Sequence, residues 1–326
     1  MIQQMIAPQR TPGSERDESR APRMPAHERQ RGSSDALPAA MTRAASTQAY
    51  YTARFLADHD RRLDAYRAYA YFRWVDDTLD QAESERSARL AFVARQQSLV
   101  ERIYQGERPD DLTAEEWMLA DLIQSDDEAD SILQSYIRNM MAVMAFDARR
   151  RGLVITEREL SDYALRLATA VTDALHYFIG HAYTPPRSES RYLPAMAAHI
   201  SHMLRDTFED VEAGYFNVPC ELLASSGIAP GDVTSAPYRE WVRSRVELAR
   251  AYFKAGAGYL DQVTSLRCRI AGYAYMARFT GLLDIIEREG YQLRPTYPEV
   301  ADPRYGLRMA GAVGAHALLP LLRGRS

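Results

Sequence analysis

Apolar residues recur three and four positions apart along almost the whole chain after residue 40, with Ala, Leu, Arg and Glu abundant around them. This spacing places apolar side chains on one face of an α-helix, and these residue types favour helices. No segment shows convincing alternation of apolar and polar residues, which would indicate a β-strand. The pattern predicts an all-α protein with about eight to ten helices.

Clusters of Gly, Pro, Ser or Asp interrupt the helical pattern and predict loops at residues 109–112, 151–155, 185–190, 225–236 and 293–302. Thr156 and Glu159 have the spacing of a capping box, which predicts a helix from there to about residue 182. That helix carries a narrow apolar stripe, suited either to lining a cavity or to ordinary core packing: Tyr163, Leu167, Ala170, Val171 and Ala174.

The predicted fold begins after a polar N-terminal segment. Residues 1–40 are rich in Pro, Ser, Arg and Glu and contain no apolar signal-peptide core, so they are expected to form a disordered tail. Residues 41–326 contain no evident repeat or linker and are predicted to form one domain. Their apolar segment 307–322 is expected to pack on this domain or on lipid.

Composition excludes several classes of function. With 40 Lys and Arg against 44 Asp and Glu, the net charge of −4 gives no sign of a nucleic-acid-binding surface. The two cysteines, Cys220 and Cys268, form no CxxC pair, so neither a disulfide framework nor a cysteine zinc site is expected, and a reducing cytoplasm is the simplest location. No apolar run is long enough to span a membrane, which leaves only peripheral membrane contact open.

A first acidic cluster lies in the segment AYAYFRWVDDTLDQ. Tyr69, Arg73, Asp76 and Asp80 follow at helical spacings and share one face, whereas Asp77 points about 100° away from it. Aromatic residues surround this polar stripe. Taken alone, the cluster fits either a functional carboxylate pair or an exposed face with local ion pairs.

A second acidic cluster follows about 125 residues later, in HMLRDTFEDVEAGYFNVP. His199, His202, Asp206 and Asp210 lie along one helical face, with Arg205 in a neighbouring row. Two histidines three residues apart without an HExxH pattern are weak evidence for zinc.

Together, the two clusters offer a carboxylate pair each. Facing pairs of carboxylates suit hard cations such as Mg²⁺, or Mn²⁺, which keep open positions for phosphate oxygens. We therefore expect a metal-diphosphate site next to an apolar cavity, for a substrate with a diphosphate head and an apolar tail. Between the clusters, Asp173 and His176 lie in an apolar segment and are expected to pair with each other or to serve the polar end of that cavity.

Several motifs in the same order resemble the squalene and phytoene synthase family. They are the YxxxRxxDDxxD string of Tyr69 to Asp80, the LRDxxED string of Leu204 to Asp210, the SxxxYY start at Ser46 and the LxxYxxxxAxxV run at Leu160. The resemblance covers about residues 44–292. It implies the all-helical, class I isoprenoid synthase fold, a single-domain bundle whose two acid motifs face a central apolar cavity.

The resemblance also implies roles for individual residues. The implied metal ligands are Asp76, Asp80, Asp206 and Asp210, with His202 where the family has Asn. Together with Tyr69 and Tyr163, near the reacting carbons, the four Asp residues make up the catalytic set. The implied substrate-binding positions are Arg73, Arg205, Ser46, Tyr50, Asp77, Val171, Thr172 and Asn217.

The reaction that the resemblance implies is the head-to-head joining of two prenyl diphosphates of C15 or C20 with release of diphosphate. Departures at His199, His202 and the segment following Gly214 leave two alternatives open: cyclisation or lysis of a single prenyl diphosphate, and a non-catalytic binding or assembly protein. No GxGxxG segment opens a helix after a strand, so no NADPH-dependent step is expected.

Overall fold

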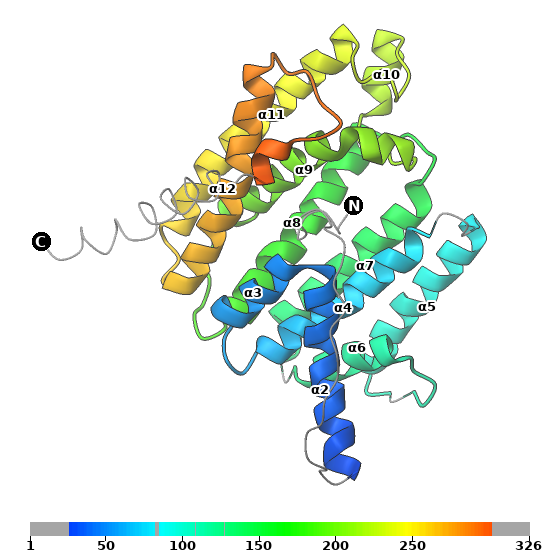
Figure 1. Ribbon diagram of the computed structural model, residues 1–326, viewed down its shortest axis with the longest axis vertical. Helices are drawn as coiled ribbons and strands as arrows, with labels where there is room; N and C mark the ends of the chain where they lie inside the picture. Colours follow the sequence, from blue (N-terminus) through cyan, green and yellow to red (C-terminus); the bar gives the residue numbers. More distant parts are fainter. Residues whose placement is uncertain (1–25, 82–84, 108, 127, 302–326) are drawn as a thin grey trace, which may run out of the picture.

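The computed structural model describes residues 26–81, 85–107, 109–126 and 128–301, which form a bundle of helices (Figure 1). Over these ranges there are eleven α-helices and two short 3₁₀ helices, and the one β-type pairing is an isolated parallel bridge between Ile155 and Pro219. The all-α prediction is confirmed, and the helices are slightly more numerous than the eight to ten predicted.

The helices follow one another along the chain with short connections. Their bounds are α2 (Ala26–Ala45), α3 (Thr47–Leu56), α4 (Arg62–Leu79), α5 (Arg86–Tyr104), α6 (Ala114–Gln124), α7 (Ile132–Arg150), α8 (Glu157–Ile179), η1 (Glu189–Tyr192), α9 (Leu193–Glu212), α10 (Cys220–Ser226), α11 (Ala236–Leu260), α12 (Leu266–Arg288) and η2 (Pro298–Ala301).

Helix α8 occupies the middle of the bundle. In Figure 1, α4 to α7 lie on one side of it and α9, α11 and α12 on the other. The capping box predicted at its start is present, since the Thr156 hydroxyl accepts from the Glu159 backbone and the Glu159 carboxylate accepts from the Thr156 backbone. The helix ends at Ile179, three residues earlier than predicted, with Gly180 as its C-cap.

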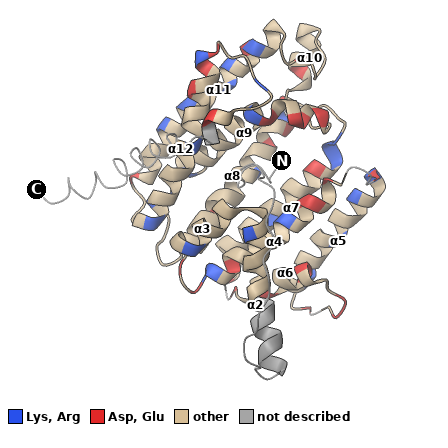
Figure 2. Cartoon of the chain, viewed as in Figure 1, with Lys and Arg blue, Asp and Glu red and all other residues tan. Residues whose placement is uncertain are grey.

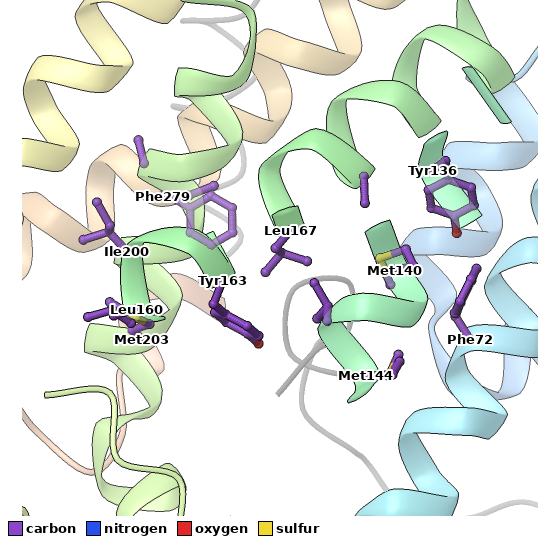
Figure 3. Close-up of a cluster of buried hydrophobic side chains, with 14 of the residues drawn as sticks. Phe72, Tyr136, Met140, Met144, Leu160, Tyr163, Leu167, Ile200, Met203 and Phe279 are labelled. Carbon is purple, nitrogen blue, oxygen red and sulfur yellow. The ribbon is translucent and has the colours of Figure 1, made fainter. Parts of the chain in front are cut away.

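The core forms where α8 meets its neighbours. Figure 3 shows Phe279, Ile200 and Met203 beside Leu160 and Tyr163, while Phe72 lies near Tyr136 and Met140. The apolar stripe of α8 is therefore largely a core stripe: Leu167 and Ala170 are almost fully buried. Val171 and Ala174, which are only partly buried, line a cavity instead.

Other element boundaries also differ from those expected. Helix α2 begins at Ala26, inside the segment assigned to a disordered tail, so the helical part starts earlier than residue 41; residues 1–25 lie outside the described ranges. The loop at residues 57–61 between α3 and α4 was also missed. Its sequence ADHDR has neither Gly nor Pro, the strongest signals of a break.

The expected pairing of Asp173 with His176 is wrong. Asp173 accepts hydrogen bonds from Ser135 (2.6 Å) and Arg191 (2.6 Å), whereas the His176 ring lies 2.7 Å from the hydroxyl of Tyr259. Each buried group thus finds its partners on other helices. Burial lowers the pKa of His176 to about 4, so this imidazole is neutral at pH 7.

The surface carries both charges. Figure 2 shows acidic and basic residues interspersed over the helices. No helix within the described ranges is long and apolar enough to cross a membrane. The apolar segment at 307–322, expected to pack on the domain or on lipid, lies outside the described residues.

Candidate active site

The first acidic cluster lies at the C-terminal end of α4. Asp76 is buried, with 5% of its surface exposed, and Asp80 follows as the C-cap, its backbone N–H donating to the Asp76 carbonyl (3.0 Å). Asp77 points outward as its spacing predicted, and its carboxylate accepts from Arg73 Nε (2.8 Å). Both interpretations of this cluster therefore apply, to different residues. Asp76 faces the interior, as a functional carboxylate would, whereas Asp77 forms an exposed ion pair with Arg73.

The second acidic cluster lies in the last turns of α9. Asp206 and Asp210 are both buried, at 8% and 4% exposed. Arg205 forms two hydrogen bonds with the Asp206 carboxylate, from Nε (2.6 Å) and Nη2 (2.8 Å). His202 and His199 lie on the same helix and are almost fully buried.

Helix α7 supplies a buried ion pair that the sequence interpretation missed. Arg150 Nε donates to Asp147 Oδ1 (2.7 Å), and the Tyr163 hydroxyl donates to Asp147 Oδ2 (3.1 Å). The Arg150 guanidinium also lies 5.0 Å from the ring centre of Tyr163, within cation–π range. The sequence did carry one sign of this ion pair: Asp147 and Arg150 are oppositely charged and three residues apart at the end of the mostly apolar segment MMAVMAFDARR.

Two loops meet beside this ion pair. Gly152 and Gly214, which follow α7 and α9, both have positive φ, and the Gly152 backbone N–H donates to the Gly214 carbonyl (2.8 Å). The turn brings Asn217 between two helices: it accepts from Arg150 Nη1 (2.9 Å) and donates to Asp210 Oδ2 (2.8 Å). Asn217, implied to bind substrate, is thus a buried bridge from α7 to Asp210.

The same turn links the second cluster to the first. The hydroxyl of Tyr215 donates to Asp80 Oδ1 (3.4 Å), while the Tyr215 backbone N–H donates to the Asp210 carbonyl (2.7 Å). The two acid motifs, far apart in sequence, therefore converge at one end of the bundle with Asp147 between them.

This convergence crowds negative charge in a buried place. Burial, with repulsion from Asp80 and Asp147, raises the pKa of Asp76 to about 7. Burial, with repulsion from Asp206 and Asp147, raises the pKa of Asp210 to about 8. A bound cation would relieve that repulsion, so these oxygen ligands fit a hard divalent metal.

The two histidines of α9 are neutral. Burial lowers the pKa of both His199 and His202 to about 3. The His199 ring lies against Tyr163, with ring centres 5.2 Å apart, and the His202 ring lies against Phe279 at 4.7 Å. Over the described residues, no three His, Cys, Asp or Glu side chains are placed so that they could together hold a metal ion without moving.

An apolar cavity of about 370 Å³ lies between α3, α4, α8, α9 and α12, and none of the acidic residues of the two motifs lines it. Val171 and Thr172 of α8 line it, as does Tyr69 of α4, whereas Asp76 lies two turns further along α4. On α9 the lining residue Ala195 precedes Asp206 by eleven positions, about 16 Å along the helix. The cavity thus extends away from the carboxylates between the same helices that carry them.

The two remaining predicted positions lie at the start of α3, and neither lines the cavity itself. Ser46 caps α3, its hydroxyl accepting from the Ala49 backbone (3.1 Å), and Tyr50 stacks on Tyr66 with ring centres 5.4 Å apart. Arg278 of α12 was not predicted; it lines the cavity and donates to Gln48 (2.8 Å). Its sequence context, YMARFTG, carries no motif that distinguishes it from a surface arginine.

Comparison with known proteins agrees with this geometry. The model of the squalene/phytoene synthase family matches residues 42–304. The chain belongs to the squalene/phytoene synthase family. This is a family of prenyl-transferring synthases, and the resemblance first seen in the acid motifs is confirmed over most of the chain.

Solved structures of the same fold match most of the chain. The squalene synthase HpnC from Alicyclobacillus acidocaldarius matches with a TM-score of 0.64 and 19% identity over 83% of this chain and 98% of its own. A dehydrosqualene synthase in complex with ligand gives a TM-score of 0.66 and 16% identity over 89% and 98%. Curated proteins gave no match. The predicted isoprenoid synthase fold is confirmed.

Proposed function

We propose that this protein is a Mg²⁺-dependent prenyltransferase that joins two prenyl diphosphates, of C15 or C20, head to head and releases diphosphate. The observation that carries the proposal is the convergence of buried carboxylates from α4, α7 and α9, with an apolar cavity further along α4 and α9. The cavity suits the prenyl tail, and the carboxylates suit the metal that accompanies the diphosphate.

The residues that would hold the metal are those of the two motifs: Asp76, Asp80, Asp206 and Asp210, with His202 beside them. Mn²⁺ suits the same donor set. When bound, the metal neutralises the diphosphate and favours its departure as an anion. The raised pKa values of Asp76 and Asp210 support this assignment, because crowded carboxylates gain most from a cation.

The chain's own residues would act on the organic part and on the leaving group. Arg73 and Arg205 would donate to diphosphate oxygens, each exchanging a carboxylate partner for the substrate. Tyr69, on the cavity wall, and Tyr163, at the buried Asp147, would present aromatic rings to positive charge developing on the allyl group. Closely packed apolar side chains would exclude water from that charge.

Release of pyrophosphate tests the proposal. Purified protein with Mg²⁺ and farnesyl or geranylgeranyl diphosphate should release pyrophosphate, and Asp76→Ala or Asp206→Ala should abolish release. Arg243→Ala, which removes an exposed ion pair of α11, serves as the control and should retain it. Absence of release, together with no diphosphate binding by calorimetry, would contradict the proposal that the protein is an enzyme.

Mass spectrometry of the product distinguishes the enzymatic alternatives. A product with twice the carbon number of the substrate supports head-to-head condensation. An unchanged carbon number supports a cyclase or lyase that acts on one prenyl diphosphate.

A further inference from the structure

One nitrogen of Arg205 contacts two hydrogen-bond acceptors of the second acid motif, an imidazole nitrogen and a carboxylate oxygen. Arg205 Nη2 is 2.8 Å from Asp206 Oδ2 and 3.1 Å from His202 Nδ1. A positively charged group is therefore held by one carboxylate oxygen and one imidazole nitrogen. All three side chains come from a single turn of α9, which fixes their spacing.

The contact with Arg205 determines which nitrogen of His202 carries the proton. A guanidinium only donates hydrogen bonds, so His202 Nδ1 accepts and its lone pair points toward Arg205 and Asp206. The proton then lies on Nε2, which is buried without a hydrogen-bond partner among the described residues. Phe279 packs against the ring and restricts its rotation.

The spacing of the two donors fits a metal ion. His202 Nδ1 and Asp206 Oδ2 are 3.5 Å apart. Two ligands that each lie about 2.1 Å from one metal ion at a tetrahedral angle are about 3.4 Å apart. The pair thus needs little movement to hold a metal ion in place of the guanidinium nitrogen.

We propose that His202 Nδ1 and Asp206 bind one divalent cation in place of Arg205 Nη2, and that the imidazole nitrogen makes this position favour a later transition-metal ion such as Co²⁺ over Mg²⁺. The inference deepens the proposed function, because it rests on the second motif being a metal site. An imidazole ligand favours such ions, whereas Mg²⁺ prefers oxygen alone. Once the metal displaces it, the Arg205 guanidinium can donate to the diphosphate.

Metal binding without substrate tests the inference. Pulsed electron paramagnetic resonance of the Mn²⁺-loaded wild-type protein should show coupling to a ¹⁴N nucleus of an imidazole. The coupling should disappear in His202→Asn and persist in His199→Asn. His199 is a suitable control because it is as buried as His202 and lies on the same helix. Its ring packs against Tyr163 and not beside Arg205 and Asp206.

Calorimetry with Co²⁺ and Mg²⁺ gives a second readout. In His202→Asn the ratio of Co²⁺ to Mg²⁺ affinity should fall on the order of ten- to a hundredfold, the scale at which altered metal-site residues act. His199→Asn should leave the ratio unchanged. Absence of ¹⁴N coupling in the Mn²⁺-loaded wild-type protein would overturn the inference, whether or not the variants fold. An equal fall of the Co²⁺ to Mg²⁺ affinity ratio in His202→Asn and His199→Asn would also overturn it.

Failure of this inference and failure of the proposed function give different results. Pyrophosphate release with Mg²⁺ and no imidazole coupling would leave the prenyltransferase proposal intact and refute the nitrogen ligand. Imidazole coupling in a protein that neither releases pyrophosphate nor binds prenyl diphosphates would refute the enzyme and retain the metal site.

Discussion

At the scale of single residues, the unusual feature is the environment of the buried carboxyls. Asp76 and Asp210 have pKa values raised to about 7 and about 8 by burial and by neighbouring carboxylates. Each therefore binds more protons in the folded protein than in the unfolded chain, where the ordinary value is near 3.8. Their contribution to stability is complete below pH ~4 and is lost as the pH rises through 7 and 8.

We predict that the metal-free protein loses stability as the pH rises from about 4 to about 8, because Asp76 and Asp210 hold protons in the folded state that the unfolded chain has already released. Urea unfolding in the presence of a chelator at several pH values measures this slope. Mg²⁺ should stabilise the protein more at pH 8 than at pH 5, because metal ligands must be deprotonated.

The double variant Asp76→Asn, Asp210→Asn provides the control for that slope. Its amides do not titrate, so its stability should depend less on pH over the same range. A wild-type protein whose unfolding free energy is constant from about pH 4 to about pH 8 would contradict the raised pKa values.

The sequence identified some site residues and not others for a physical reason. Arg73, Asp76 and Asp80 could be predicted because all lie on one helix, where residue spacing determines direction. Asp147 and Arg278 could not, because each becomes part of the site only through the packing of α7 or α12 against other helices. The partners of Asp173 and His176 were mistaken for the same reason.

At the scale of elements, the packing of α11 on α9 depends on a missing side chain. Gly256 of α11 lies directly against Pro194 at the start of α9, and an added Cβ would overlap the proline ring. Gly258, two residues on, has no atom within 4 Å of an added Cβ. The same substitution in one helix should therefore have opposite effects at the two positions.

We predict that Gly256→Ala lowers the free energy of unfolding by about 1 to 3 kcal/mol, the usual cost of overpacking. Gly258→Ala should leave it unchanged or raise it by up to about 1 kcal/mol, because Ala favours the helix. Chemical denaturation of both variants measures the difference. Equal effects would show that α11 does not approach Pro194 closely.

At the scale of the whole molecule, the charged site and the apolar cavity lie at different points along the same helices. Ala195 lies on the cavity wall near the start of α9, and the carboxylates lie near the end of the same helix. The length of tail that fits should therefore depend on side chains at this distant part of the wall.

We predict that Ala195→Phe reduces use of geranylgeranyl diphosphate more than use of farnesyl diphosphate, by about tenfold or more in relative kcat/KM. A tenfold change corresponds to about 1.4 kcal/mol, within the range that one or two displaced methylene groups account for. Pyrophosphate release with each substrate provides the measurement.

The neighbouring Met196→Phe, at a position outside the cavity lining, is the control and should leave the ratio unchanged. A parallel loss with both substrates in Ala195→Phe would indicate that the tail does not reach this part of the wall.

The sequence by itself determined the helical class, the starts of helices such as α8, and the face of α4 that carries Asp76. These depend on interactions between residues a few positions apart, which spacing alone reveals. Only the tertiary structure decided that Asp147 lies near both acid motifs, that Asn217 anchors Asp210, and where the cavity lies. Those contacts join helices distant in sequence, and they form only when burial brings the helices together.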